Sequence, residues 1–527
     1  MNGIIEKGEQ SNMPQPKKTK SIEESLWSCC DKLRGGVETQ NYKHVVLSLI
    51  FLKFIGDTFE ERRAELIAEG NEKFIDVVDF YTMKNVFYLP EEARWSYIVK
   101  NSSKPNITSI IDSAMDIIEK NNKSLKGALP KNFFSNLNIE VSKLKKLIDD
   151  INNNIDTQAD KSHDLIGRIY EYFLKKFAIA EGKGKGEFYT PKSVVNLIAE
   201  MIQPWSGIIY DPCCGSGGMF VQSLKFVEAH QGNTKDIAVF GQESMDSTYK
   251  LAKMNLAIRG ITGDLGEVAA DTFSKDQHPD LKVDYIMANP PFNLKDWRGE
   301  NELKNDPRWK GYDIPPASNA NYGWILHMIS KLKKNKGIAG FLLANGALND
   351  SDTKSIRKRI IENNLIEAII ILPRDTFYST DISVTLWIIN KDKKAHAGNI
   401  GEKKVIFRDR EDEILFMDLR QWGSEFDKKY KELTPEDIKK VAGVYHDWQC
   451  ENNSYMDTPE FCKSVKKSEI AKNDYSLIPS RYIEFIDNDS SINFEREFNT
   501  ISTQIKDILN EEVTARDGLK NALKGLN

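Results

Sequence analysis

The chain has 527 residues, which is too long for one hydrophobic core and predicts two or three domains. Hydrophobic residues make up 40% and charged residues 29% of the sequence, which excludes a largely disordered chain. A net charge of −5 argues against a protein that binds many nucleic-acid phosphates without a partner. No apolar run is long enough for a signal peptide or a membrane span.

The first part of the chain is predicted to be helical. Ser21 can cap a first helix, because Glu24 follows three residues later and the apolar residues of SIEESLWSCCDKLRG fall near one face. The next stretch, YKHVVLSLIFLKFIGDTFEERR, has a wide apolar face that predicts a buried helix. Helical spacing continues to about Ile155, so we expect a helical N-terminal domain over residues 20–155.

The pattern changes near residue 160, where a short amphipathic helix over residues 164–178 leads into a loop rich in Gly and Lys, residues 181–186. Apolar, often β-branched runs then alternate with helical stretches; the runs are GIIYD, IAVFGQE, VDYIMAN, GIAGFLLAN, LIEAIIILP and SVTLWIIN. This alternation predicts an α/β domain over residues 160–450, with a mostly parallel sheet covered on both faces. The last strand follows a short loop, so it can be an antiparallel partner of the strand before it.

The end of the chain is predicted to be a helical segment over residues 455–527. Apolar residues recur there at helical spacing, at Phe494, Phe498, Ile501, Ile505, Ile508 and Leu509. An amphipathic helix at a chain end usually docks on another surface, so we expect a role in subunit assembly.

The six cysteines and the histidines show no metal-ligand or redox spacing. We therefore propose no metal site and expect reduced thiols, as is typical of a cytoplasmic protein.

The first of three chemical motifs is IIYDPCCGSGGMF, in which a strand ends at Asp211 and a glycine-rich turn leads into a helix. In an open α/β sheet, such a turn lets a nucleotide-like ligand approach bare backbone at the carboxyl ends of the strands. The motif matches neither the dinucleotide fingerprint nor the P-loop, which disfavours NAD or ATP. A turn that only closes a βα unit remains the alternative.

Two acidic residues follow the next strands. Glu243, after IAVFGQ, is placed to accept both hydroxyls of a ribose, as in dinucleotide-binding folds. Asp271, in GEVAADTF, is a candidate acceptor for an adenine amino group. A solvated loop carboxylate is the alternative for Glu243.

The third motif is DYIMANPPFN, in which a buried strand runs into two prolines that cannot donate ladder hydrogen bonds. Asn289, Pro290, Pro291 and Phe292 form a rigid turn at the end of this strand. The side-chain carbonyl of Asn289 and the main-chain carbonyl of Pro290 can converge on one point, beside the ring of Phe292. Such a site accepts two hydrogen bonds from an exocyclic amino group whose ring stacks on the phenyl group.

This turn offers no strong base, no metal ligand and no nucleophile. An aromatic amine is a poor nucleophile because its lone pair is delocalised, and two hydrogen-bond acceptors help to localise that pair. The amine then requires a strong electrophile, and the methyl group of a sulfonium meets that need. On its own an Asn-Pro-Pro turn is more often structural, but the order of the three motifs favours chemistry.

Together DPCCGSGG, NPPF and the upstream GEFYTP resemble the S-adenosylmethionine-dependent N6-adenine methyltransferases of DNA. Over residues 20–490 the chain resembles the modification subunit of type I restriction-modification systems, from LWSCCDKLRGGVETQNYKHVVLSLIFLKFIGDTFEERR to YSLIPSRYIEF. The resemblance implies a Rossmann-like methyltransferase sheet with a helical N-terminal domain and a C-terminal helical segment. It also implies S-adenosyl-L-methionine as cofactor and methyl transfer to the N6 amino group of adenine.

The resemblance assigns roles to individual residues. Those implied to be catalytic are Asn289, Pro290, Pro291 and Phe292. Those implied to bind the cofactor are Glu187, Phe188, Tyr189, Thr190, Pro191, Lys192, Asp211, Ser216, Gly217, Gly218, Glu243 and Asp271. Family members often have Gln at the position of Glu187 and small residues at those of Cys213 and Cys214, which leaves the affinity for the cofactor open.

The implied partners are double-stranded DNA with the target adenine extruded, a specificity subunit, a second copy of this chain and a restriction subunit, with no membrane involved. A separate specificity subunit accounts for the absence of a basic recognition helix after the sheet domain.

Several alternatives remain. A target-recognition region within residues 391–527 would make the chain self-sufficient, and a similar turn could hold a glutamine amide of a protein substrate. A binding module without activity would tolerate loss of Asn289. Cytosine N4 methylation would use the same turn, although such enzymes tend to begin it with Ser. Cys213 as a covalent nucleophile is disfavoured, because it precedes the glycine turn instead of lying on a target-base loop.

Overall fold

The computed structural model describes residues 23–24, 27, 39–154, 165–181, 189–378, 382–426, 429–451, 454–486 and 494–524. The first predicted helix therefore lies almost wholly outside the described residues, as do most of the Gly/Lys loop and the predicted cofactor residues Glu187 and Phe188.

The N-terminal region is helical, as predicted, and its centre is α2 (Thr39–Ala68). Apolar side chains cover most of the circumference of α2, so neighbouring helices bury it on several sides. A left-handed turn ends the helix, because Gly70 with φ +74° allows the Asn71 N–H to donate to the Leu66 carbonyl at 2.8 Å. The other elements are η1 (Glu72–Phe74), α3 (Asp79–Thr82), η2 (Glu91–Ala93), α4 (Trp95–Lys100), α5 (Ile107–Asn121), η3 (Lys123–Leu125) and α6 (Val141–Asn154).

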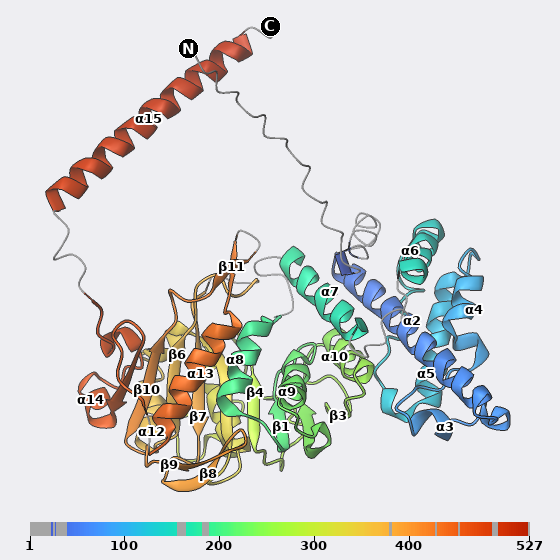
Figure 1. Cartoon of the computed structure of the whole chain (residues 1–527), viewed down its shortest axis with the longest axis horizontal. Helices are drawn as coiled ribbons and strands as arrows, with labels where there is room; N and C mark the ends of the chain where they lie inside the picture. Colours follow the sequence, from blue (N-terminus) through green and yellow to red (C-terminus); the bar gives the residue numbers. More distant parts are fainter. Residues whose placement is uncertain are drawn as a thin grey trace, which may run out of the picture.

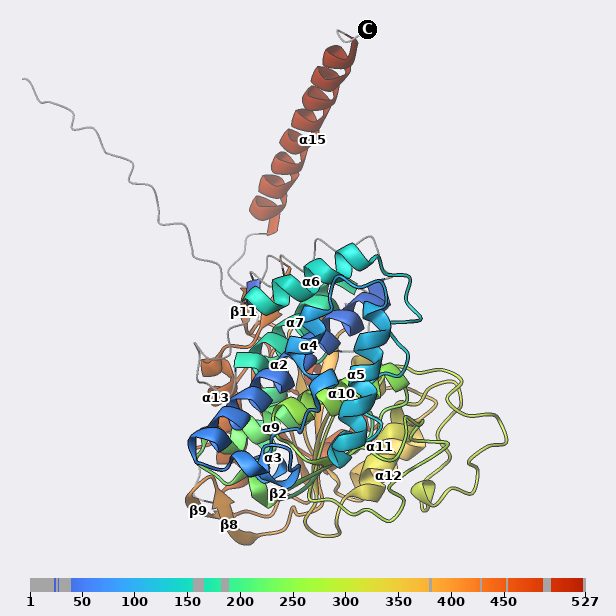
Figure 2. The same cartoon turned by 90° about the vertical axis from the view of Figure 1, so that its right-hand side faces the viewer.

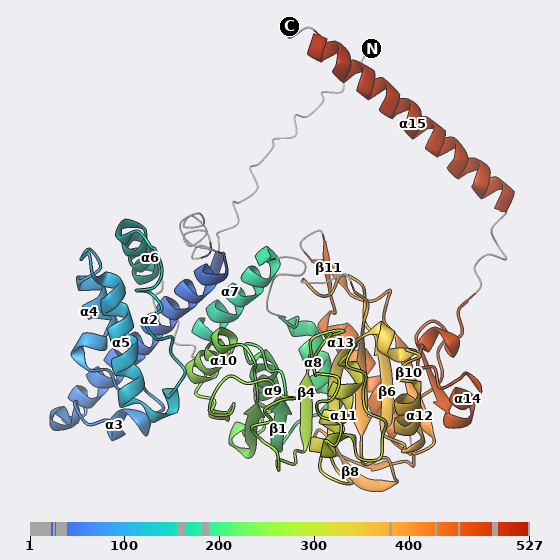
Figure 3. The same ribbon diagram turned by 180° about the vertical axis from the view of Figure 1, so that it is seen from behind.

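The core of this helical region extends into the rest of the chain. It includes side chains of α7 (Leu165–Glu181) and of α10 (Asp246–Ile258), such as Phe173, Leu251 and Met254. Figures 1 and 3 accordingly show α7 and α10 between the helices at one end of the molecule and the sheet at the other. Figure 2 looks from the helical end, with α2 and α5 in front.

The sheet has nine strands in the order β13-β10-β6-β7-β5-β4-β1-β2-β3. Their bounds are β1 (Gly207–Asp211), β2 (Ile237–Gly241), β3 (Gly263–Asp264), β4 (Tyr285–Ala288), β5 (Ile338–Ala344), β6 (Ile366–Ile371), β7 (Val384–Asn390), β10 (Glu413–Asp418) and β13 (Cys462–Lys466). All six predicted strands are present, and β7 is antiparallel to both β5 and β6, whereas β5, β4, β1, β2 and β3 run parallel. The α/β prediction and the antiparallel partner are thus confirmed.

Helices cover both faces of the sheet, as the apolar strands require. One face packs against α8 (Lys192–Ile202), α9 (Gly218–Ala229), α10 and α13 (Pro435–Gln449). The other face packs against α11 (Asn321–Lys331) and α12 (Lys354–Glu362), which come forward in Figure 3. Shorter elements complete the domain: η4 (Thr234–Asp236), η5 (Pro307–Trp309), η6 (Asn345–Leu348), the hairpins β8 (His396–Ile400) with β9 (Lys403–Phe407) and β11 (Ser424–Phe426) with β12 (Tyr430–Glu432), α14 (Lys467–Lys472) and η7 (Pro479–Arg481).

The C-terminal part differs from the helical segment expected from residue 455. Residues 462–466 form β13, which pairs antiparallel with β10 and closes one edge of the sheet. Ile470 and Tyr482 then pack into the sheet core. We therefore propose that the segment outside the sheet domain begins after residue 486, and its helix is α15 (Phe494–Lys524). None of the helices in the described part of the chain has the length and apolar character that crossing a membrane requires.

Candidate cofactor and target-base site

The three predicted motifs meet at one edge of the sheet. β1 lies between β2 and β4 and is parallel to both, so their carboxyl ends, at Asp211, Gly241 and Ala288, are neighbours. Each motif begins directly beyond one of these ends. The chain crosses to opposite sides of β1 here, and this topological switch point is where open α/β sheets bind their ligands.

Backbone and side-chain hydrogen bonds join the glycine turn to the end of β2. Gly217 has φ +79°, a left-handed conformation that glycine adopts readily, and it caps α9. The Gly215 N–H donates to Oε2 of Glu243 at 3.0 Å, and the Cys214 N–H donates to the Gln242 carbonyl at 2.9 Å. These bonds place Glu243 beside the bare backbone of the turn.

Both oxygens of Glu243 accept backbone hydrogen bonds, since Oε1 also accepts from the Met245 N–H at 2.9 Å. The Ser244 hydroxyl also donates to Oε1 at 3.3 Å, so donors from the glycine turn and from the segment after β2 orient this carboxylate at the cavity. Asp271 accepts from the N–H groups of Phe273 and Ser274 and so shapes the loop that follows β3.

Asp211 is only 1% exposed, and its Oδ1 accepts from the Cys213 N–H at 3.0 Å. The pKa of Asp211 is raised to about 7. Burial is the largest cause of this rise, the hydrogen bonds from Cys213 partly oppose it, and the charge of Glu243 adds to it. Burial, followed by the charge of Asp211, also raises the pKa of the Cys213 and Cys214 thiols well above the usual value. Both cysteines are therefore neutral thiols, and a thiolate nucleophile is disfavoured.

The amide of Asn289 is fixed on one side and open on the other. Its Nδ2 donates to the Thr190 hydroxyl at 2.9 Å, and Thr190 lies just ahead of Pro191, the residue that caps α8. Its Oδ1 is buried and has no hydrogen-bond partner among the described residues. A buried carbonyl without a donor is costly, so this atom is a candidate acceptor for a ligand N–H.

The turn after Asn289 is tied to α11 by an amide pair. The Asn293 N–H donates to Oδ1 of Asn321 at 3.1 Å, and Nδ2 of Asn321 donates to Oδ1 of Asn293 at 2.9 Å. The ring of Phe292 is half-buried and meets Phe377 edge-on, with 6.1 Å between centroids.

A cavity of about 610 Å³ brings most of these groups together, a size typical of small-molecule sites. Predicted residues that line it are Tyr189, Thr190, Asp211, Ser216, Gly218, Glu243, Asp271, Asn289 and Pro291. The predicted residues Pro191, Lys192, Gly217, Pro290 and Phe292 are described but do not line it. Phe292 packs instead against the core on the face of the sheet that α8 and α13 cover.

The helical N-terminal region also lines the cavity, a contribution that the sequence did not predict. The residues are Asn41, Lys43, His44, Ser48, Pro130, Lys131 and Phe133. Polar positions on a helix normally mark its solvated side, so no local pattern could have revealed that these face a ligand cavity. Leu294 and Trp324, also missed, line it from the sheet domain.

Within the described ranges, no three or more His, Cys, Asp and Glu side chains are grouped so that they could hold a metal ion.

The sheet, its switch point and the cavity have the architecture of an S-adenosylmethionine-dependent methyltransferase. The solved structure of the type I restriction-modification system methyltransferase subunit from Streptococcus thermophilus shares this fold, with a TM-score of 0.74 and 22% identity over 88% of this chain and 99% of that chain. A modification subunit of a putative type I restriction enzyme from Vibrio vulnificus gives a TM-score of 0.59 and 21% identity over 87% of this chain and 94% of that chain.

Sequence comparison identifies the family. Residues 161–490 match the family described as N-6 DNA Methylase, and residues 22–151 match the HsdM N-terminal domain. The Type I restriction enzyme MjaIX methylase subunit of Methanocaldococcus jannaschii is 36% identical over 96% of this chain and 92% of its own length. The HindI methylase subunit of Haemophilus influenzae is 39% identical over 83% of this chain and 99% of its own length.

The chain belongs to the N-6 DNA methylase family, among the methylase subunits of type I restriction enzymes. It is accordingly an adenine-specific DNA methyltransferase, as the resemblance implied.

Proposed function

We propose that this chain uses S-adenosyl-L-methionine to methylate an adenine extruded from double-stranded DNA, in a complex whose specificity subunit selects the sequence. The observation that carries the proposal is the buried, unpartnered Oδ1 of Asn289, held at the cavity by the bond from its own amide to Thr190.

The residues of the cavity fit the proposed cofactor. Glu243 and Asp271 both line the cavity, and their carboxylate oxygens are acceptors of the kind that ribose hydroxyls and an adenine amino group require. Acidic groups at the ends of β1 and β2 complement a ligand that carries a positive sulfonium. When bound, this cofactor would supply an electrophilic methyl group that needs no metal and no covalent enzyme intermediate.

The target amine is oriented by acceptors. Asn289 Oδ1 accepts a hydrogen bond from one N–H of the adenine amino group and the Pro290 carbonyl accepts one from the other, which draws the nitrogen lone pair away from the ring. Thr190 keeps the Asn289 amide from rotating, so the carbonyl is already placed when the base arrives. The half-buried ring of Phe292, outside the cofactor cavity, stacks on the extruded base and offsets part of the unstacking cost of a few kcal/mol.

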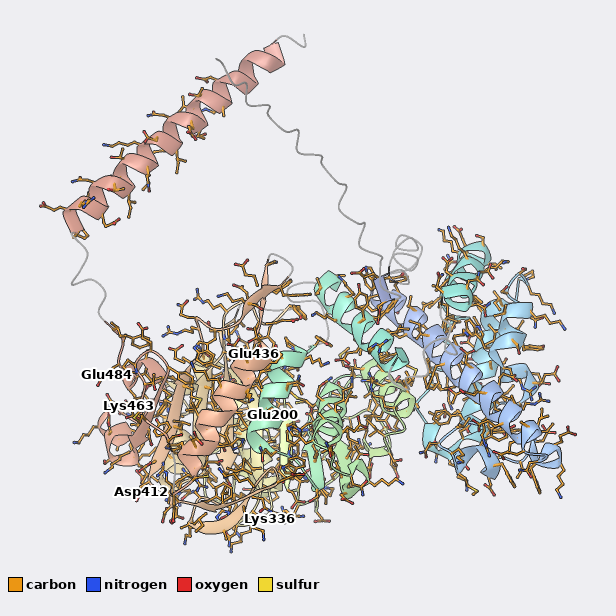
Figure 4. All side chains as sticks on the ribbon, in the orientation of Figure 1. Glu200, Lys336, Asp412, Glu436, Lys463 and Glu484 are labelled. Atoms are coloured by element: carbon orange, nitrogen blue, oxygen red, sulfur yellow. The ribbon has the colours of Figure 1, made fainter. Side chains whose placement is uncertain are left out.

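Partner binding is assigned to α15. Its apolar residues are exposed, with Phe494 at 75% and Ile508 at 64%, and the described residues leave the helix clear of the sheet domain (Figures 2 and 4). A stripe of this kind matches the helix-on-helix packing expected with a specificity subunit. A solved neighbour with a TM-score of 0.62 and 19% identity, over 94% of this chain and 100% of that chain, comes from a study of complex assembly of the type I R-M system. We assign two copies of this chain and a restriction subunit to the full complex, which acts in the cytoplasm.

The test is methyl transfer from tritiated S-adenosylmethionine to double-stranded DNA, by this chain with and without its co-purified specificity subunit. We expect incorporation only with the partner present. Equal incorporation by the chain alone would favour a self-sufficient enzyme, and no incorporation with either preparation would refute the proposal.

A further inference from the structure

The helical N-terminal region forms one wall of the cavity. This wall contains a side-chain hydroxyl whose hydrogen-bonding is unusual for a buried group. Ser48 lies in the middle of α2, is only 2% exposed and lines the cavity. No residue in the described ranges forms a hydrogen bond with its Oγ. A buried hydroxyl without a partner in a close-packed interior disfavours the folded state, unless a bound molecule completes its hydrogen bonds.

Two other helical hydroxyls in the described residues bond to the backbone of their own helix, although Ser193 Oγ in α8 is buried without a partner there. In the same helix, Thr58 Oγ1 donates to the Phe54 carbonyl at 2.9 Å, four residues back. In α9, Ser223 Oγ donates to the Met219 carbonyl at 2.8 Å in the same way. This back-bond is the usual arrangement for Ser and Thr inside helices. Ser48 makes no such bond within the described part of the chain, and it lines the cavity.

A second hydroxyl of the same kind lies across the helix interface. Thr248, in the first turn of α10, is 2% exposed and lines the cavity, and in the part of the chain that the structure describes its Oγ1 has no partner. α2 and α10 pack together, since Leu251 and Met254 of α10 belong to the core of the helical region. Figure 3 shows this junction between the helical end and the sheet. The two unpartnered hydroxyls therefore come from two packed helices and line the same cavity.

We propose that Ser48 and Thr248 hydrogen-bond the bound cofactor, so that the helical N-terminal domain forms one wall of the cofactor site. This inference rests on the proposed function. Thr248 lies five residues beyond Glu243, the proposed ribose acceptor, in a segment that lines the cavity continuously from Glu243. A nucleoside cofactor carries hydroxyl and amino groups, which can form hydrogen bonds with side-chain hydroxyls as well as with carboxylates.

Cofactor binding is then coupled to domain packing. A ligand held by both α2 and α10 stabilises the contact between the helical domain and the sheet domain, and a firm contact strengthens ligand binding by the same factor. Loss of either hydroxyl weakens binding without altering the acidic residues at the sheet edge.

The experiment measures the affinity of the full chain for S-adenosylhomocysteine by isothermal titration calorimetry. The variants are Ser48→Ala and Thr248→Val, which remove only the hydroxyl function. Each is expected to weaken binding about threefold to tenfold, the effect of one lost hydrogen bond. Ser223→Ala is the matched control, because it removes a buried helical hydroxyl outside the cavity, and its affinity should equal that of the unchanged protein.

The melting temperature provides a second readout that a merely structural role would not produce. Without ligand, both variants should melt at or above the temperature of the unchanged protein, since an unpaired buried hydroxyl has been removed. With S-adenosylhomocysteine, their gain in melting temperature should be smaller.

Affinities equal to that of the unchanged protein, together with weaker binding by Glu243→Ala, would overturn this inference and leave the proposed function intact. Failure of the unchanged protein to bind S-adenosylhomocysteine would overturn both.

Discussion

The carboxyl group of Asp211 illustrates how burial at the end of β1 changes the chemistry of one residue. The folded protein raises its pKa to about 7, whereas an unfolded chain leaves it near the ordinary value of about 3.9. The folded state thus binds this proton more tightly. The contribution of Asp211 to the free energy of unfolding is therefore greatest below about pH 4 and is lost as the pH rises towards 7.

Asp211→Asn should remove this pH dependence. The side-chain oxygen that accepts from the Cys213 N–H is kept, but the titratable group is gone. Between pH 5 and pH 7.5 the unchanged protein should lose stability relative to the variant, by an amount of order 1–4 kcal/mol. Urea unfolding at both pH values measures the difference, and parallel pH profiles for the two proteins would contradict the assignment.

At the residue scale, the sequence singled out many of the side chains that line the cavity. It did not predict the long-range contacts that hold these side chains in place. The proline pair after a buried strand was enough to single out Asn289. Its partner Thr190 is 99 residues away, and only the fold shows that the hydroxyl fixes the amide. The unpartnered Ser48 gave no signal, because its surroundings depend on how α2 packs against α10.

At the scale of elements, a buried ion pair joins β6 to the loop that precedes β10. Glu367 of β6 and Arg410, in the loop before β10, are 0% and 1% exposed and 3.0 Å apart. Gln449, at the end of α13, also donates to Glu367 at 2.9 Å. One carboxylate thus connects a strand, a loop and a helix.

Glu367→Ala should destabilise the protein by about 3–5 kcal/mol, because the guanidinium of Arg410 would remain buried without its counter-ion. The control is Lys143→Ala, which breaks an exposed ion pair with Glu140 and should change stability by less than about 1 kcal/mol. Denaturant unfolding of both variants measures this contrast. Equal stability of the two would show that the buried pair contributes little.

The strands that the sequence predicted are those with apolar runs, namely β1, β2, β4, β5, β6 and β7. The strands it missed carry weaker patterns, and β3 has only two residues. β10, EILFMD, is flanked by charged residues, and β13, CKSVK, has almost no apolar character because it lies at the sheet edge with one open side. Pairing with β10 makes β13 a strand, so tertiary context decides its structure.

For the whole molecule, the sheet domain and α15 serve separate tasks. The apolar stripe of α15 is exposed, and the cavity is lined by residues 41–324. Removal of residues 487–527 should therefore leave the affinity for S-adenosylhomocysteine within about twofold. The same truncation should abolish co-elution with the specificity subunit in size-exclusion chromatography. A truncated chain that still co-elutes would place the subunit contact elsewhere.

The net charge of −5 is consistent with these separate roles, since a partner that reads the DNA sequence can also supply much of the positive charge that binds the phosphates. The domain order was evident from changes in sequence pattern. The contribution of the helical domain to the cavity was not, because it arises from the packing of α2 on α10.

The most direct test is mass spectrometry of nucleosides from DNA methylated by the complex, with the unchanged chain and with Asn289→Ala. The unchanged chain should yield N6-methyladenine. The variant should yield at least about 100-fold less, because a preorganised acceptor is lost, while binding S-adenosylhomocysteine nearly as well. Undiminished N6-methyladenine from the variant, or N4-methylcytosine from the unchanged chain, would contradict the account.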